Sequence, residues 1–256
     1  MNNRSQRAVI PGNRPRGILA QGQGALALTR VEQIGRSAEK TPGFVVGFAA
    51  EARAARGLGW PVAVGGGSAA GATAAAQRLV TAGVTGLISF GLAAGLDASL
   101  PAGTVIVADA VMTGGRLWRT DTALSARLGG TTGHLCLGLD HIVADQTEKR
   151  RLGRETGAAL ADMESAAVAA VADAAGLPFG VLRAICDPAS RTLPPAALVA
   201  LDASGRLAPT RIVWSVLTRP GQVPALLALA REAATARHAL RSRLAGLRTA
   251  RKFSGA

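Results

Sequence analysis

Three carboxylic acids and one arginine stand in segments that are otherwise apolar. Asp162 and Glu164 flank one methionine in a run of small apolar residues, and Asp187 ends the apolar segment 179–187, four residues after Arg183. Apolar surroundings raise the pKa of a carboxyl group so that it can donate a proton, while a nearby carboxylate can steady a positive charge. Each acid alone also fits a structural role, at a helix N-terminus or in a turn. Their combination predicts a charged site where the two segments meet.

The elements that must position these residues follow an alternating pattern. Short apolar runs with turn residues at their ends alternate with alanine-rich stretches of helical spacing, which is typical of an α/β domain with a largely parallel sheet. Strands are expected within residues 43–50, 61–64, 84–97, 102–112 and 179–187, and helices before Gly83, over 121–128, from 147, and over 163–175, 208–218 and 223–247. Ligands bind at the carboxyl ends of strands in such folds. Strand alternation places Arg183 and Asp187 on one face.

Charge divides the chain into three parts. Residues 1–41 lack periodicity and are expected to form a flexible basic tail, 42–205 a catalytic domain, and 206–256 a basic helical extension packed on that domain. The net charge is +13, of which +9 falls on 206–256, whereas 43–205 is nearly neutral. Basic ends suit an anionic surface, either membrane headgroups or nucleic acid. A compositional bias toward arginine explains the same charge without any partner.

The predicted helix 223–247 is amphipathic. Leucine and alanine recur every three or four residues on one side and arginines occupy the others. The apolar positions are Leu226, Leu229, Ala233, Ala236, Leu240, Leu244 and Leu247. Such a helix either approaches anionic lipid or packs on the core with a solvated arginine face, and both interpretations stay open.

Several classes of protein fit the composition poorly. Aromatic residues make up 3% of the chain and tyrosine is absent, so stacking platforms for nucleic acid are not expected. Cys136 and Cys186 form no CxxC pair, and the spacing of His134 and His141 matches no standard ligand pair, so neither zinc nor another metal is indicated. No uncharged apolar run reaches the roughly 18 residues of a membrane span, and the N-terminus lacks the apolar region of a secretory signal. We expect a cytoplasmic protein, peripheral to the inner membrane face if its basic ends bind lipid.

Four segments together carry a family resemblance. "ADMESAAVA", followed about twenty residues later by "VLRAICDPAS", resembles the nucleoside phosphorylase and nucleosidase superfamily, which includes methylthioadenosine/S-adenosylhomocysteine nucleosidases. "FVVGFAAEARAAR" resembles its opening strand and "LISFGLAAGLDASLPAGTVIVADAV" its central glycine loop, so the match spans roughly 43–190. The resemblance implies a three-layer αβα nucleoside phosphorylase fold with a central mixed, largely parallel sheet.

The region after this match is similar to one branch. The stretches "DPASRTLPPAALVALDASGR" and "TRPGQVPALLALAREA" resemble the hopanoid-associated phosphorylases, also described as adenosylhopane nucleosidases. This resemblance implies that a 5′-modified adenosine, adenosylhopane, is converted in hopanoid biosynthesis to adenine and ribosylhopane or its phosphorylated form. It also implies a substrate with a lipid-like 5′ group and a homo-oligomer whose neighbouring subunit completes the active site. A methylthioadenosine/S-adenosylhomocysteine nucleosidase, a non-catalytic nucleoside-binding protein and a basic nucleic-acid binder are the alternatives.

The resemblance assigns roles to the acids of the opening motif. Cleavage of an N-glycosidic bond builds positive charge on the ribose and negative charge on the leaving base, and the enzyme must relieve both. Asp187 would donate a proton to the purine ring nitrogen, and Glu164 would hold the ribose hydroxyls and steady the sugar. Met163 would pack beneath the sugar, and Asp162 would support the site structurally.

The nucleophile is assigned less directly. In the hydrolytic branch a glutamate after the first strand activates water, and Glu51 is the acid near that place, one residue out of register. Arg183 would orient the nucleophile and Glu164, although a core-edge ion pair is the alternative. Leu92 stands where phosphorylases have a serine, which argues against phosphorolysis. No cofactor is expected, and phosphate would be a co-substrate only if phosphorolysis occurs. The remaining substrate contacts are expected at Ala93, Ala94 and Cys186.

A competing motif lies earlier in the chain. Gly65, Gly67 and Ala70 fit G-x-G-x-x-A after a strand, the fingerprint of dinucleotide-binding oxidoreductases. That fingerprint also needs an acid about 20 residues later for the ribose. No aspartate or glutamate occurs between Glu51 and Asp97, so this interpretation is disfavoured.

Overall fold

In the computed structural model, which describes residues 41–198 and 209–253, the apolar runs form one mixed sheet. Its strands are β1 (Gly43–Val46), β2 (Val62–Val64), β3 (Leu87–Gly95), β4 (Val105–Val107), β5 (Ala110–Thr113), β6 (Arg116–Arg119), β7 (Leu135–Gly138), β8 (Leu160–Asp162) and β9 (Phe179–Asp187). The order is β2-β1-β3-β8-β7-β5-β6, and β9 pairs with β3 and β4. The pairs β3/β8, β4/β9 and β5/β6 are antiparallel and the others parallel. The sheet is therefore mixed and largely parallel, as predicted.

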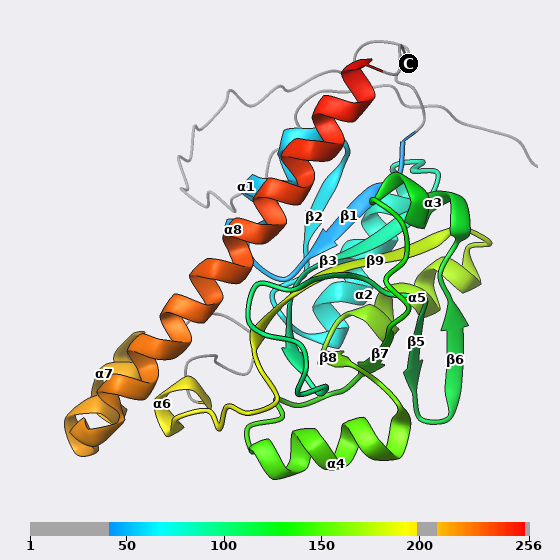
Figure 1. Cartoon of the computed structure of the whole chain (residues 1–256). Helices are drawn as coiled ribbons and strands as arrows, with labels where there is room; N and C mark the ends of the chain where they lie inside the picture. Colours follow the sequence, from blue (N-terminus) through cyan, green and yellow to red (C-terminus); the bar gives the residue numbers. More distant parts are fainter. Residues whose placement is uncertain (1–40, 199–208, 254–256) are drawn as a thin grey trace, which may run out of the picture. The chain divides into compact units, whose positions relative to one another are not determined.

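Helices cover both faces of this sheet (Figure 1). They are α1 (Ala49–Ala55), α2 (Ala69–Thr81), α3 (Thr122–Arg127), α4 (Gln146–Thr156), α5 (Ser165–Ala174), α6 (Pro195–Leu198), α7 (Pro209–Thr218) and α8 (Val223–Phe253), with 3₁₀ turns η1 (Arg56–Leu58) and η2 (Pro220–Gln222). Buried alanine and leucine side chains of α2 and α5 pack on one face, and those of α1, α3 and α8 on the other. This arrangement is the predicted three-layer αβα fold.

The structure differs from the sequence prediction at several elements. The single strand expected within 102–112 is two strands, because β4 pairs with β9 whereas β5 pairs with β7. The strand expected within 84–97 is β3, which runs up to Gly95. Strands β6, β7 and β8 were not predicted, and the helix expected over 163–175 begins only at Ser165. A strand as short as β8 shows no periodicity of its own, and its pairing with β7 and β3 decides its conformation.

The glycine-rich loop after β2 serves helix packing. Ser68 caps α2 by accepting a hydrogen bond from the backbone N–H of Gly71 at 3.2 Å. A Cβ atom on Gly71 would lie 1.6 Å from the carbonyl oxygen of Gly65, so only glycine allows this approach. A Cβ atom on Gly65 would lie 2.9 Å from the Ala72 backbone nitrogen, and Gly67 has a φ of 71° with its Cβ position 2.7 Å from the Phe48 ring. Close packing and backbone conformation thus explain the two glycines of the competing motif without a dinucleotide.

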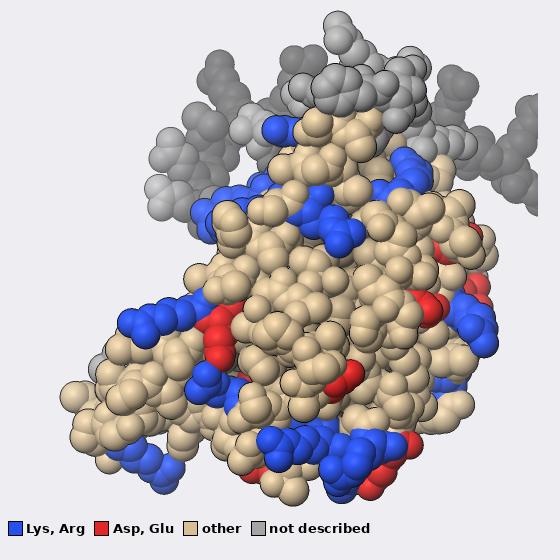
Figure 2. Space-filling model, in the orientation of Figure 1, with Lys and Arg blue, Asp and Glu red and all other residues tan. Residues whose placement is uncertain are grey.

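The C-terminal region forms the two helices expected, α7 and α8, with η2 at the predicted break. Ala236, Leu240 and Leu244 of the apolar stripe are buried and pack into the core, so this part of the stripe is not open to lipid. Basic side chains follow the outer side of α8 (Figure 2). Among the helices of the described ranges, none combines the length and hydropathy needed to cross a bilayer. The expected tail over 1–41 lies, except for its last residue, outside the described residues.

Candidate active site

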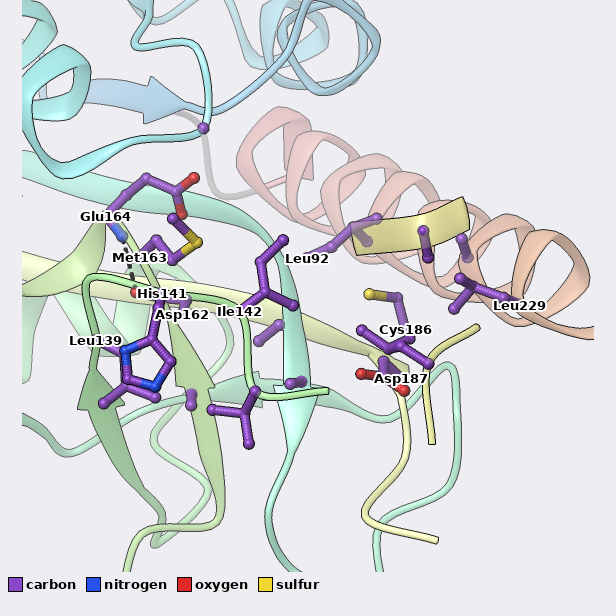
Figure 3. Close-up of a pocket in the computed structure, with 18 of the residues that line it drawn as sticks. Leu92, Leu139, His141, Ile142, Asp162, Met163, Glu164, Cys186, Asp187 and Leu229 are labelled. Atoms are coloured by element: carbon purple, nitrogen blue, oxygen red, sulfur yellow. Dashed lines mark hydrogen bonds between the residues drawn. The ribbon is translucent and has the colours of Figure 1, made fainter. Parts of the chain in front are cut away.

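Asp162, Glu164 and Asp187 line one cavity of about 320 Å³, a volume typical of small-molecule sites. Glu164 and Asp187 lie on opposite sides of Leu92 and Ile142 (Figure 3). The walls come from β3, the β8–α5 junction, the end of β9, the segment after β7, α6 and α8. Their residues are Phe48, Gly67, Leu92, Ala93, Ala94, Leu139, His141, Ile142, Val143, Ala161, Asp162, Met163, Glu164, Cys186, Asp187, Leu193, Ala197, Leu229 and Ala233.

A tight turn from β8 into α5 positions Glu164. The Asp162 carboxylate accepts hydrogen bonds from the backbone N–H groups of Glu164 at 3.1 Å and Ser165 at 2.8 Å. These bonds satisfy donors that the start of α5 would otherwise leave free, so Asp162 shapes the turn. Glu164 stands just before the helix as its N-cap residue, with 8% of its surface exposed. Asp162, for which we expected a structural role, thus fixes the backbone at Glu164, which we expected to bind the sugar.

Arg183 joins both acids to β3. Its Nε lies 2.7 Å from the Asp162 carboxylate and a terminal nitrogen lies 3.0 Å from Glu164. It also donates to the Ser89 hydroxyl at 2.6 Å and the Leu92 carbonyl at 3.2 Å. Because its side chain is only 2% exposed, Arg183 supplies the compensating charge that two buried carboxylates require.

Burial and the neighbouring charges shift the pKa of Glu164 in opposite directions. Burial raises the pKa of Glu164 from its usual 4.5 to about 7, although the Arg183 guanidinium works in the opposite direction. The negative charges of Asp162 and Glu51 raise that pKa further. Glu164 therefore changes its charge near neutral pH.

Glu51 lies on the first turn of α1 and does not line the cavity. Its carboxylate accepts hydrogen bonds from the backbone N–H groups of Phe48 at 2.9 Å and Leu92 at 3.2 Å. A methyl group built on Gly47 would lie 3.3 Å from Glu51 and 3.2 Å from Glu164, so both carboxylates flank the same narrow space. Burial raises the pKa of Glu51 as well. The carboxylate predicted to activate water thus also ties α1 to β3.

A bulge near the end of β9 directs Asp187 into the cavity. The pairing with β3 shifts between Ala93 and Ala94, so that Cys186 is an extra residue on β9. The bulge interrupts the alternation from which we expected Arg183 and Asp187 to share a face. Cys186 and Asp187 both line the cavity, whereas Arg183 does not. The expectation from strand alternation was therefore wrong.

The Asp187 carboxyl group has one paired and one unpaired oxygen. Oδ2 lies 2.6 Å from Nζ of Lys149 on α4, whereas Oδ1 is buried without a hydrogen-bond partner among the described residues. Burial raises the pKa of Asp187 from 3.8 to about 6, and the Lys149 ammonium limits that rise. Asp187 thus has a pKa near the physiological range and one oxygen free for a ligand.

The predicted contact residues fall into two groups. Met163, Glu164, Ala93, Ala94, Cys186 and Asp187 line the cavity, while Glu51 and Arg183 do not. Two titratable residues were not predicted for the site: Lys149, which pairs with Asp187, and His141, which lines the cavity. Within 41–198 and 209–253, no group of histidine, cysteine and acidic side chains could hold a metal ion.

Comparisons with known proteins agree with this architecture. Residues 134–217 match the family described as Phosphorylase superfamily. No significant match was found among curated proteins.

Solved structures share the fold at low sequence identity. The 5′-methylthioadenosine/S-adenosylhomocysteine nucleosidase of Helicobacter pylori, solved with butyl-thio-DADMe-Immucillin-A, is 17% identical with a TM-score of 0.57, covering 81% of this chain and 98% of its own. Futalosine hydrolase of H. pylori is 17% identical with a TM-score of 0.56 and the same coverage. The Neisseria meningitidis nucleosidase, in complex with methylthio-immucillin-A, is 15% identical with a TM-score of 0.56, covering 80% and 97%. This chain therefore has the three-layer fold of these nucleosidases.

Proposed function

We propose that this protein is a member of the nucleoside phosphorylase and nucleosidase superfamily that cleaves the N-glycosidic bond of a 5′-modified adenosine and releases adenine. The observation that carries the proposal is the placement of Glu164 and Asp187 on opposite sides of one cavity. The match of residues 134–217 to the Phosphorylase superfamily and the nucleosidase fold support it.

The two acids would act on opposite parts of the nucleoside. Asp187, protonated on the free Oδ1, would donate its proton to the purine ring nitrogen while the bond between C1′ and the base breaks and its electron pair moves to the base. Glu164 would accept hydrogen bonds from the ribose hydroxyls, and its charge would stabilise the cationic sugar. Met163 would pack against the ribose. Arg183 would keep Glu164 in place.

We propose water rather than phosphate as the nucleophile. The described cavity lining includes no lysine or arginine that could hold a phosphate dianion, whereas it includes the acids Asp162, Glu164 and Asp187. Arg183 is engaged by its own partners and does not line the cavity. Glu51 would accept a proton from water in the narrow space beside Gly47. No cofactor takes part in this scheme.

We propose a lipid-like 5′ substituent, as in adenosylhopane. With the base near Asp187 and the ribose near Glu164, the rest of the cavity lining is largely apolar and comes from the segment after β7, the loop before α6, α6 and α8. It includes Leu139, Ile142, Val143, Leu193, Ala197, Leu229 and Ala233. An aliphatic group gains roughly 25 cal/mol for each Å² that it buries there. Methylthioadenosine or S-adenosylhomocysteine is the alternative substrate.

Product analysis tests this proposal. Adenosylhopane, methylthioadenosine and S-adenosylhomocysteine are incubated with the protein, each with and without phosphate, and the products are separated by chromatography. We expect adenine release that does not need phosphate and that falls by at least about 100-fold in Asp187→Asn, while Asp173→Asn on the surface leaves it unchanged. Thermal stabilisation by the nucleosides with no turnover would instead identify a non-catalytic binding protein.

We also propose that the protein works at the cytoplasmic face of the membrane. Trp214 and Leu217 of α7 and Leu227 of α8 are 71%, 69% and 53% exposed, and Leu229 on the same helix lines the cavity. Tryptophan at a lipid interface and nearby arginines suit anionic headgroups.

Vesicle co-sedimentation tests the membrane proposal. We expect Trp214→Ser with Leu217→Ser to reduce binding to anionic vesicles, while Leu117→Ser, also at an exposed leucine, does not. Equal vesicle binding by the wild type and both variants, or binding of DNA in place of vesicles, would contradict the membrane proposal.

We also propose that the protein forms a homo-oligomer, whose mass sedimentation velocity would measure directly.

A further inference from the structure

Lys149 is a fully buried lysine that none of the roles above uses. It lies on α4, whose N-terminus is capped by Asp145, and its side chain is 0% exposed. The ammonium donates to Asp187 Oδ2 at 2.6 Å, to the Arg191 carbonyl at 2.8 Å and to the Pro188 carbonyl at 3.5 Å. All three donors of the ammonium are therefore engaged at the end of β9.

A buried cation of this kind needs a reason beyond stability. Burying two charges costs several kcal/mol per ion, and an apolar pair of similar volume is often as stable. The pair also leaves Asp187 Oδ1 unpartnered within the described residues, although a buried carboxylate oxygen without a partner is costly. The arrangement makes sense if Oδ1 meets a ligand and Oδ2 is held still.

We propose that Lys149 is a positioning residue for Asp187, holding Oδ2 so that Oδ1 faces the leaving base and stabilising the carboxylate that remains once Asp187 has given up its proton. This inference rests on the proposed function. In the reaction the proton moves from Oδ1 to the purine ring nitrogen, so Asp187 changes from neutral to anionic as the base leaves. The Lys149 ammonium keeps its own protons and meets that new negative charge at 2.6 Å. Glu51 passes the proton that it takes from the attacking water to solvent, and Asp187 regains a proton from solvent before the next turnover.

The other charges around Asp187 do not replace Lys149. Arg191, on the loop after β9, pairs with Glu232 of α8, so the two largely offset each other. The pKa of Asp187 is raised by burial and lowered first by Lys149, with Glu232 and Arg191 as smaller opposing influences. On α4, the neighbouring Arg150 is exposed. Lys149 is therefore the cation that sets the acidity of Asp187.

Two variants test this inference. Lys149→Met removes both charge and donors, whereas Lys149→Gln keeps a donor and removes only the charge, which guards against loss of folding. An opposite charge at this distance lowers an aspartate pKa by about 1–3 units. We therefore expect the Asp187 pKa, followed by carbon NMR of labelled aspartate with Asp187→Asn for assignment, to rise by about 1–3 units in both variants. Arg150→Met is the matched control and should not move it.

Activity gives a second readout. In both variants kcat should fall by roughly 10–100-fold, and the alkaline decline of kcat/KM should move to higher pH. Folded variants in which the Asp187 pKa and the alkaline decline both stay at their wild-type positions would overturn the inference. The NMR titration needs no turnover, so a protein that fails to release adenine refutes the proposed function without deciding the role of Lys149.

Discussion

Replacing Arg183 by methionine should destabilise the fold far more than replacing an exposed arginine. Arg183→Met keeps much of the side-chain volume but leaves the carboxylates of Asp162 and Glu164 buried without their cation. Breaking a buried ion pair by removing one partner typically costs about 3–5 kcal/mol. For a domain of this size, that corresponds to a decrease of roughly 6–20 °C in Tm.

The penalty should also depend on pH. The pKa of Glu164 is about 7 in the folded protein against the usual 4.5, so between these values the folded state holds a proton that the unfolded chain has lost. The free energy of unfolding therefore falls as pH rises through this window. Without Arg183 the folded-state pKa rises further, and the loss continues to higher pH. Arg183→Met should thus cost more stability at pH 8 than at pH 5.

Thermal and urea unfolding, followed by circular dichroism at both pH values, measure this difference. The matched control is Arg151→Met, which removes an exposed arginine–carboxylate pair with Glu155 at 2.6 Å. Such a pair along a helix contributes only about 0.3–0.5 kcal/mol. If both variants lost equal stability, or if the loss in Arg183→Met did not grow with pH, the buried charges would not be organised as described.

Three further predictions concern catalysis, the cavity wall and packing. Activity needs Asp187 protonated and Glu164 ionised, so a plot of kcat/KM against pH should be bell-shaped with its maximum between about pH 6 and 7. In a steady-state pH series, Glu164→Gln should lower kcat/KM and remove the acidic limb of this profile. Leu229→Ser should reduce kcat/KM roughly ten-fold for nucleosides with apolar 5′ groups but leave adenosine nearly unaffected in parallel assays. Gly71→Ala should cost about 1–3 kcal/mol or more in urea unfolding, because its Cβ would lie 1.6 Å from a loop carbonyl oxygen, whereas Gly246→Ala in open space on α8 should gain about 0.4–1 kcal/mol.

The sequence predicted those element boundaries that depend on neighbouring residues in the chain. The helix end near Gly83, the gap between the helices expected over 208–218 and 223–247, and the strand ending at Asp187 depend on residues adjacent in the chain. Each lies close to its expected position. Strand β8 was missed because Leu160 and Ala161 carry no pattern of their own. Their extended conformation comes from pairing with β7 and β3, which lie far away in the sequence. Pairing of this kind cannot be derived from spacing alone.

The same limit applies to the charged residues of the site, of which the sequence marked the acids but not Lys149. Asp162, Glu164 and Asp187 stood out because acids are rare in apolar segments, so their context marked them for function. Lys149 belongs to "TEKRR", a polar stretch that looks like any solvated helix face, and nothing within it indicates a buried ammonium. Its burial follows from Asp187, 38 residues later in the chain. A lysine in a charged stretch of sequence can be identified as buried only from the tertiary contacts that bury it. Lys149, which sets the acidity of Asp187, could therefore be found only in the structure.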